Sequence, residues 1–314
     1  MSLAVIMSNN PLKERIFEHG LAFIQESCIA IRTKCGNTNM VHDRRSALSS
    51  YITEMLSTGR SVFTAAEAVT ALNVSHGAFL DAAERLQRRN ALLNPRQGFY
   101  VAIPSQYVSW GAPPPAWYID ALMKHEGVGY YVGLLKAAEL HGATHQAVME
   151  FQVVTPKRFP KIRAGRSLIV FYYRKNIMEV ADGIEPRKTD TGTMQVSSPA
   201  LTALDLLRYP QASAGIDNVA TVLTDLGPKI DGEQLASLSK LMERPIVQRL
   251  GYLLDRLGHA TVTEGLHRAL LERGSPGWVE LDRKEARDPD FTVEPIARDS
   301  HWRVIVRRAP EIDE

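Results

Sequence analysis

Polar and cationic side chains gather between residues 64 and 97 of the sequence. Ser75 and His76 carry groups that can hydrogen-bond to base edges, whereas arginine side chains can neutralise phosphates. We therefore predict that this stretch binds DNA, with Ser75 and His76 reading bases and the arginines holding the backbone. An ordinary solvated face of a small helical domain is the alternative. The predicted DNA contacts are Thr64, Ser75, His76, Arg85, Arg88, Arg89, Arg96 and Gln97.

Two helices must position these side chains. Thr64 and Glu67 have the spacing of a capping box, which predicts a helix start after Thr64. Turn-favouring residues at 73–75 end that helix and provide the cap of a second one. In the second helix the apolar residues repeat at helical spacing, at Phe79, Ala82, Ala83 and Leu86. The second helix is the predicted recognition helix.

A hairpin is predicted directly after the second helix. Two apolar runs, at residues 91–93 and 99–103, flank a loop that contains Pro95 and Gly98. Arg96 is the exposed cation expected in this loop. Helix, turn, helix and hairpin in this order predict a winged helix-turn-helix, which lays its second helix in the major groove.

A second group of cations follows a predicted strand in the middle of the chain. Residues 156–166 contain five basic residues and no acidic one, and two more basic residues follow the next strand. Such a surface attracts a polyanion or an acidic protein, although a solvated loop has the same composition. We interpret it as a contact patch for nucleic acid or an acidic protein partner, formed by Lys157, Arg158, Lys161, Arg163, Arg166, Arg174 and Lys175.

Catalytic and metal-binding patterns are weak, and we expect no enzyme activity, no cofactor and no metal. Ser237 and Lys240 have the S-x-x-K spacing, but the sequence supplies no recognisable partners for an activated serine. His141 and His145 lie four residues apart without the glutamate of an H-E-x-x-H motif. The histidines and cysteines between residues 19 and 42 lack the short pairs typical of zinc sites.

Composition limits the class of protein. The chain has 314 residues, a net charge of +2 and a pI near 8.5, so any DNA footprint must be local. Two cysteines are too few for a disulfide-rich secreted scaffold and favour a reducing cytoplasm. No apolar run approaches the roughly 20 residues that span a bilayer.

The predicted fold class is α+β, with an N-terminal winged helix-turn-helix, then a mixed domain with a small sheet, and a C-terminal helical block. We expect strands at residues 151–154, 167–173, 177–180 and 194–196, mostly in antiparallel pairs, and helices at 117–124, 130–141, 200–208, 216–226, 232–241, 245–257 and 262–272. Two more strands are expected at 278–281 and 302–306. The predicted domains are an N-terminal extension (1–43), the winged domain (44–104), a proline-rich linker (105–116) and a C-terminal α/β domain (117–314).

Several blocks of this sequence, in this order, resemble the antitoxin and transcriptional-repressor component of AbiE-type abortive-infection systems, which are type IV toxin–antitoxin systems. The blocks are RLQRRNALLNPRQGFYVAIP, YYVGLLKAAELHG, VVTPKRFPKIRAG, VSSPALTALDLLRYP, AGIDNVATVL, VQRLGYLLDRLG and HWRVIVRR. The resemblance covers residues 45–307, and about the first 40 residues fall outside it.

The resemblance implies a winged domain that represses its own operon at repeated operator sites. It also implies a C-terminal antitoxin domain that counteracts a nucleotidyltransferase-like toxin, without requiring a stable complex with it. The resemblance favours the DNA role of the matching segment, at Ser75, His76, Arg85, Arg88, Arg89 and Arg96. The alternative function is a ligand-responsive winged-helix regulator without an antitoxin role, and a DNA-tethered enzyme would need a nucleophile and base that the sequence does not show.

Overall fold

The structure is a computed structural model that describes residues 39–144, 147–282 and 294–312, with side chains from residue 47 onward. Contacts divide the chain into one unit of residues 1–51 and another of residues 52–314. Helix α2 (Asn39–Ser57) begins in the first unit and ends in the second. Residues 1–38 of the predicted extension (1–43), which include both cysteines, lie outside the described residues.

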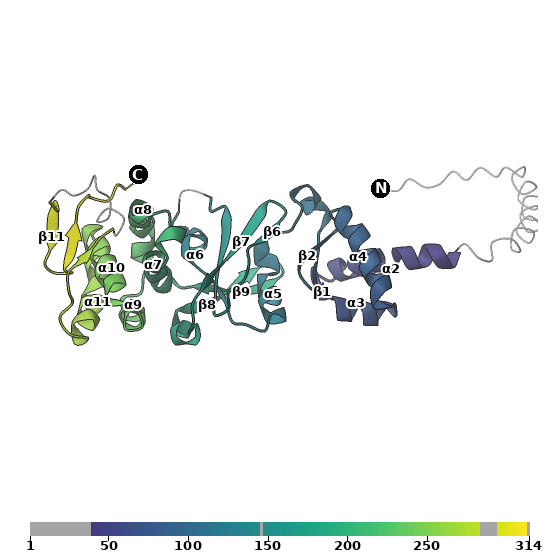
Figure 1. Cartoon of the computed structure of the whole chain (residues 1–314), viewed down its shortest axis with the longest axis horizontal. Coiled ribbons are helices and arrows are strands. Elements are labelled where there is room, and N and C mark those ends of the chain that lie inside the picture. Colours follow the sequence, from purple (N-terminus) through teal and green to yellow (C-terminus); the bar gives the residue numbers. More distant parts are fainter. Residues whose placement is uncertain (1–38, 145–146, 283–293, 313–314) are drawn as a thin grey trace, which may run out of the picture. The chain divides into compact units, whose positions relative to one another are not determined.

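After the end of α2, the second unit continues with two helices and a three-stranded sheet (Figure 1). Its elements are β1 (Val62–Thr64), α3 (Ala65–Leu72), α4 (His76–Arg88), β2 (Leu92–Arg96) and β3 (Phe99–Ala102). Strand β3 pairs antiparallel with both neighbours. Phe63 stacks on Tyr100 at 5.6 Å between ring centroids, and Phe79 meets the same ring edge-on at 5.2 Å. This aromatic group ties α4 to the sheet, so the predicted helices and hairpin are present as elements.

The proline-rich segment after β3 contains two short 3-10 helices, η1 (Ser105–Trp110) and η2 (Pro115–Trp117). Tyr107 packs edge-on against Trp117 at 5.1 Å. Proline cannot donate a backbone hydrogen bond, so 3-10 turns with few internal bonds suit this composition.

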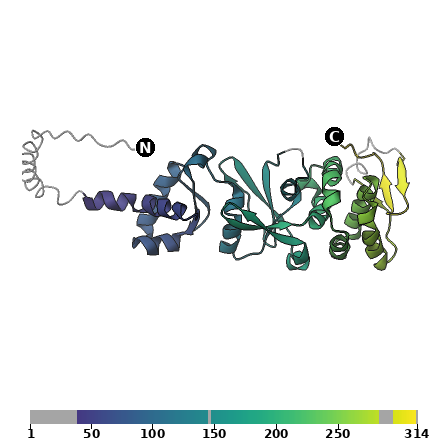
Figure 2. The ribbon, with the colours of Figure 1, turned by 180° about the vertical axis from the view of Figure 1, so that it is seen from behind.

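A six-stranded mixed sheet occupies the middle of the unit (Figures 1 and 2). Its strands run in the order β6-β7-β5-β4-β9-β8, which leaves β6 and β8 at the two edges. The β5–β7 and β4–β9 pairs are parallel, and the other three pairs are antiparallel. Most pairs of the sheet are therefore antiparallel, as predicted. The bounds are β4 (Tyr131–Val132), β5 (Glu150–Thr155), β6 (Ile162–Ala164), β7 (Ser167–Tyr173), β8 (Ile184–Thr189) and β9 (Gly192–Ser197).

Two of the predicted elements are wrong. Residues 177–180 were expected as a strand but lead into the 3-10 helix η3 (Met178–Gly183). Ile177 and Val180 are both buried, and their spacing of three residues places them on one side of a 3-10 turn. The helix expected at 130–141 begins as strand β4, and only α6 (Leu134–Leu140) is helical.

The reason for the second error lies in the two faces of the sheet. Tyr131 packs into the core on one face and Val132 into the core on the other, as alternation along a strand requires. Two adjacent apolar residues are also typical of a buried helix, so the sequence pattern alone does not distinguish the two. The second apolar layer, which buries both faces of the strand, appears only in the tertiary structure.

Helices cover both faces of this sheet. On one face, α5 (Ile119–His125) contributes Ile119, Leu122 and Met123 to a core that includes Val132 and Val153. The core of the other face joins Tyr131 and Val154 to the helical block. That block comprises α7 (Pro199–Arg208), η4 (Pro210–Ala212), α8 (Ile216–Leu226), η5 (Gly227–Lys229), α9 (Gly232–Ser239), α10 (Arg244–Arg256) and α11 (Ala260–Glu272).

A three-stranded sheet at the C-terminal end packs on α10 through Trp302. Its central strand β12 (Val304–Val306) runs parallel to β10 (Val279–Glu280) and antiparallel to β11 (Ala297–Asp299). The indole N–H of the fully buried Trp302 donates to Asp255 at 2.6 Å. Gly251 makes room for the ring, since a Cβ atom there would lie 2.3 Å from it.

The described residues thus form a mixed α/β fold with small sheets and helices, which confirms the fold class at that level. Among them, no helix combines the length and the apolar composition needed to cross a membrane.

Candidate nucleic-acid interface

Helices α3 and α4 are held by capping interactions that can be traced to single residues. The Thr64 hydroxyl accepts from the Glu67 N–H at 3.2 Å, while the Glu67 carboxylate accepts from the Thr64 N–H at 2.8 Å. This is the predicted capping box. Asn73 then adopts a left-handed conformation (φ 49°), and the Ser75 hydroxyl caps α4 by accepting from the Ala78 N–H at 3.3 Å. These caps fix where α3 begins and ends and where α4 begins.

Helix α4 and its C-cap carry four of the predicted DNA contacts. His76, Arg85, Arg88 and Arg89 are all exposed, and they run from the first residue of the helix to its C-cap. Arg88 pairs with Glu84 one turn earlier at 2.6 Å. Within the described residues, Arg85 and Arg89 have no ion-pair partner. The helix therefore offers one polar N-terminal turn and a cationic C-terminal half.

Arg96 does not face solvent as predicted. Its guanidinium lies 3.5 Å from the Glu126 carboxylate and donates to the Pro160 carbonyl at 3.0 Å. The same group lies over the rings of Phe159 and Phe171, at 5.4 and 5.7 Å from their centroids. The prediction of an exposed cation at the hairpin turn is therefore wrong, because carboxylate and aromatic partners distant in sequence hold this side chain.

The neighbouring Gln97 is exposed, and its backbone carbonyl lies 3.1 Å from the His125 ring. Asn94 donates to the Arg96 and Phe99 carbonyls and so closes the turn. The hairpin turn is thus fixed by contacts on both of its sides, with the Gln97 side chain pointing to solvent.

The second group of cations lies at one edge of the six-stranded sheet. Six of its seven members are exposed: Lys157, Arg158, Lys161, Arg163, Arg166 and Lys175. Aromatic side chains lie among them, namely Phe159, Tyr173 and Trp110, and the sequence prediction missed these. The alternation of basic and aromatic residues at 157–161 was the signal that could have found Phe159. Trp110 comes from a segment distant in sequence.

Arg174 does not belong to this surface, and its prediction as a patch residue is wrong. Its side chain is 5% exposed and pairs at 2.7 Å with Asp205, which is fully buried. Tyr131 donates its hydroxyl to the same carboxylate at 2.5 Å. Burial raises the pKa of the Asp205 carboxyl, and the Arg174 guanidinium opposes that rise. A buried charge needs such a partner, and Asp205 lies 31 residues away in the sequence.

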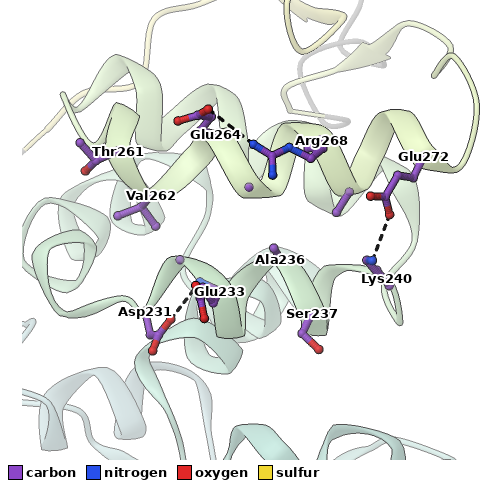
Figure 3. Close-up of a pocket in the computed structure, with 13 residues that line it drawn as sticks. Asp231, Glu233, Ala236, Ser237, Lys240, Thr261, Val262, Glu264, Arg268 and Glu272 are labelled. Atoms are coloured by element: carbon purple, nitrogen blue, oxygen red, sulfur yellow. Dashed lines mark hydrogen bonds and ion pairs between the residues drawn. The ribbon is translucent and has the colours of Figure 1, made fainter.

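An open groove runs between α9 and α11, with a volume of about 570 Å³ (Figure 3). It contains Ser237 and Lys240, the S-x-x-K pair. Lys240 reaches across to Glu272 at 3.0 Å, and Arg268 pairs with Glu264 along α11 at 3.6 Å. The Lys240 amine is therefore held by Glu272 on α11, and no hydrogen bond joins it to the Ser237 hydroxyl among the described contacts. The groove therefore shows no nucleophile together with its base.

A smaller, more apolar pocket of about 300 Å³ lies among α7, α8 and α10. Leu206, Val219 and Ile246 contribute apolar walls. At its rim, Arg208 pairs with Glu243 at 3.0 Å. This volume is at the lower end of the range for small-molecule sites, about 300–1,000 Å³.

Metal binding has no support from the part of the chain that the structure describes, where no group of three or more His, Cys, Asp or Glu side chains comes together. The histidine and cysteine positions weighed in the sequence, at residues 19, 28 and 35, lie outside that part, and the side chain of residue 42 is also not described.

Residues 131–256 match the family model of the AbiEi antitoxin C-terminal domain. This part of the chain is similar to the AbiEi antitoxin family. The matched range begins at β4 and ends with α10, so it contains the six-stranded sheet and most of the helical block. The family match indicates an antitoxin role in a type IV toxin–antitoxin system, with a toxin as partner.

A solved structure with a similar fold is that of the RV2827C protein from Mycobacterium tuberculosis. The TM-score is 0.59 at 15% sequence identity, and the match covers 83% of this chain and 91% of that one. At this identity the likeness concerns the fold alone. A comparison with curated protein sequences found no match.

Proposed function

We propose that this chain is a type IV antitoxin that also represses its own operon. In this proposal residues 44–104 form a winged helix-turn-helix that binds repeated operator sites, residues 105–116 link it to the second domain, and residues 117–314 counteract a nucleotidyltransferase-like toxin. The chain acts by binding rather than catalysis, in the cytoplasm where DNA and toxin are found. The family match over residues 131–256 supports the antitoxin half.

One observation carries the repressor half: two capped helices, joined by a short turn with a left-handed Asn73, precede an antiparallel hairpin. In a helix-turn-helix the N-terminal residues of the second helix meet base edges. His76 and the free hydroxyl hydrogen of Ser75 would make these contacts. Thr64 contributes through its cap, and the exposed Gln97 side chain replaces Arg96 at the hairpin.

Phosphate contacts are assigned to Arg85, Arg88 and Arg89. Arg85 and Arg89 lack an ion-pair partner within the described residues, and Arg88 can exchange Glu84 for a phosphate because both side chains are exposed. An exposed ion pair of this kind contributes only about 0.3–0.5 kcal/mol, so the exchange costs little.

The proposal is tested by measuring the affinity of the full chain for its own promoter fragment over a range of salt concentrations. Affinity should fall steeply as salt rises, because each neutralised phosphate releases counterions. Replacing Arg85, Arg88 and Arg89 by Ala should weaken binding to every DNA sequence and reduce the logarithmic salt slope by about 0.9 per lost contact. Binding that is absent, or insensitive to salt, contradicts the repressor half.

Arg268→Ala is the matched control for the single substitution Arg88→Ala, which should also weaken operator binding. Arg268 pairs with Glu264 four residues earlier on α11, as Arg88 pairs with Glu84 on α4, and both arginines are exposed. The control removes the same charge and the same kind of ion pair and should leave operator affinity unchanged. An equal loss in both variants would mean that only net charge matters.

His76→Ala tests base reading separately. It should change the order of preference among operator variants, since a base contact carries sequence information that a phosphate contact does not. An equal loss of affinity on every site would remove His76 from the reading set.

The antitoxin half is tested in cells that express the neighbouring toxin gene. The full chain, supplied from an unrelated promoter, should restore growth, and the variant without Arg85, Arg88 and Arg89 should do so equally. If the unaltered chain does not restore growth, the antitoxin half is wrong. Rescue that is lost only in the variant would mean that neutralisation also needs the face of α4.

The apolar pocket among α7, α8 and α10 favours one alternative, a ligand-responsive regulator without an antitoxin role. In that case a small apolar molecule would release the operator, and the chain would not rescue cells that express the toxin. Val219→Trp, which fills the pocket, should then abolish the release without changing operator affinity in the absence of ligand.

A further inference from the structure

The edge of the six-stranded sheet at β6 presents an exposed cationic surface. Among the described residues, strand β6 forms strand hydrogen bonds only with β7, at Ile162↔Ile169 through Ala164↔Ser167, and β2 of the hairpin lies beside β6 without pairing with it. The loop before β6 and the end of β7 continue the same edge. We call this the edge surface, and its exposed cations are Lys157, Arg158, Lys161, Arg163, Arg166 and Lys175.

Exposed cations of the described chain fall into two groups, those with an ion-pair partner and those without one, and Arg85, Arg89 and Lys188 belong to the second group. Arg88, Lys124, Lys240 and Arg268 each have a carboxylate within ion-pair distance. None of the six cations of the edge surface has one among the described residues. Concentrated charge without internal compensation attracts a polyanion over a range of about 8 Å at physiological salt.

Aromatic rings accompany the charge. Trp110 is 53% exposed and lies under the Arg166 guanidinium at 5.6 Å, and Tyr173 is 42% exposed and lies under Arg158 at 4.9 Å. Phe159 lies under the Lys157 ammonium at 5.1 Å. A planar guanidinium lies over an aromatic ring much as another flat ring would. A flat heterocycle can therefore take the place of the guanidinium on the ring, or stack on the side of the guanidinium that faces away from the ring.

The backbone on which two of these rings sit is fixed. Gly165 approaches η1 so closely that a Cβ atom there would lie 2.0 Å from the Trp110 carbonyl, and the Arg166 N–H donates to that carbonyl at 3.1 Å. The Tyr173 carbonyl accepts from the Tyr209 hydroxyl at 2.9 Å. Strand β7 separates the two positions by roughly 20 Å, at about 3.3 Å per residue.

We propose that the edge surface binds single-stranded polynucleotide, with phosphates held by the cations and bases stacked on Trp110 and Tyr173. A duplex hides the faces of its bases within the helix stack and cannot use these rings, whereas an unpaired strand exposes them. An acidic protein would use the charge but gives no reason for two exposed rings paired with guanidinium groups. The site is separate from α4 and does not depend on operator binding.

The test measures the anisotropy of a fluorescent single-stranded RNA of about 12 nucleotides on titration with the full chain, within the usual site sizes for such proteins. The same sequence as single-stranded DNA forms the second arm, and a duplex of that sequence is the competitor. We expect saturable binding of a single strand that the duplex does not displace. A preference for the RNA arm assigns RNA as the ligand, and equal affinities assign any unpaired strand.

Two kinds of variant separate charge from stacking. Replacing Lys157, Lys161 and Arg163 by Ala should weaken single-strand binding at least tenfold and reduce the salt slope by about 0.7 per lost phosphate contact. Trp110→Ala or Tyr173→Ala should weaken binding about tenfold without changing the salt slope, since stacking releases no counterions. Lys188→Ala, an exposed cation on β8 at the opposite edge of the same sheet, is the matched control and should have no effect.

Operator affinity, measured in parallel, should stay unchanged in all four variants, so that failure here is distinct from failure of the proposed repressor role. The proposal is overturned if no single strand binds, or if the duplex displaces it. It is also overturned if the charge variants weaken operator binding equally, or if Trp110→Ala and Tyr173→Ala both leave affinity intact. All substituted side chains are exposed, and an unchanged melting temperature verifies that each variant is folded.

Discussion

Arg174 and Lys175 are neighbours in the sequence and reach opposite environments in the structure. Arg174 is buried against Asp205 and Tyr131, whereas Lys175 is exposed on the edge surface. The same difference recurs elsewhere in the described chain. A buried basic side chain needs a partner close by, whereas an exposed one can remain a surface charge without a partner. The burial of an ion pair should therefore determine how much free energy of unfolding is lost when one partner is removed.

The largest effect on stability is expected for the buried ion pair of Arg174 and Asp205. Asp205→Ala leaves the Arg174 guanidinium buried without its counterion and should lower the free energy of unfolding by about 3–5 kcal/mol. Chemical denaturation measures the loss. Lys175→Ala is the control from the adjacent position and should change stability by less than about 0.5 kcal/mol. Similar losses in both variants would remove the distinction between the two environments.

His141 is partly buried, so its protonation would place a positive charge in a partly buried site. Its ring donates to the Ser197 carbonyl at 2.7 Å. Burial lowers the pKa of the imidazole, and the nearby Arg187 and Lys229 lower it further. A depressed pKa means that the unfolded chain binds the proton more readily, so stability is full above about pH 6.5 and is lost as the pH falls through the folded value.

We therefore expect the chain to lose stability on acidification from pH 7.5 to 5, and His141→Gln to flatten this dependence. Melting temperatures at a series of pH values measure the change. An unaltered acid dependence in the variant would assign the acid sensitivity to other groups.

The pair of Arg308 with Asp217 should have a smaller effect. Burial opposes ionisation of Asp217, but hydrogen bonds from Arg308 and from the Glu311 N–H outweigh it and lower the pKa of the carboxyl. The stabilisation is present above the unfolded pKa of about 3.9 and is lost as the pH falls through the folded value. Arg308→Ala should cost about 1 kcal/mol or less at pH 7, because the pair is partly exposed, and nothing near pH 2. A cost that persists near pH 2 would assign the effect to packing.

The smallest effect is expected for Arg88. Its pair with Glu84 is exposed on both sides, so Arg88→Ala should change the free energy of unfolding by at most about 0.5 kcal/mol. The same substitution should weaken operator binding clearly. A large loss of stability would instead make Arg88 a structural residue and would weaken its assignment to DNA.

Local rules allowed much of the fold to be predicted. The capping box of Thr64 and Glu67, the start of α4 at His76 and strand β7 at 167–173 all follow from interactions within a few residues. Strand β8 was not predicted, because an edge strand with Glu185, Pro186 and Lys188 shows no apolar alternation. Edge strands owe their structure to a partner, here β9, rather than to their own composition.

The candidate sites divide in the same way. The sequence alone determined which residues are cationic, which helix carries His76 and Arg88, and which residues cap that helix, because charge and capping are properties of single residues and their close neighbours. Only the tertiary structure decided that Arg96 turns to Glu126, that Arg174 turns to Asp205, and that Trp110 lies under Arg166. Each of these contacts joins segments at least 30 residues apart, and no local spacing rule reports which distant side chain will compensate a buried charge.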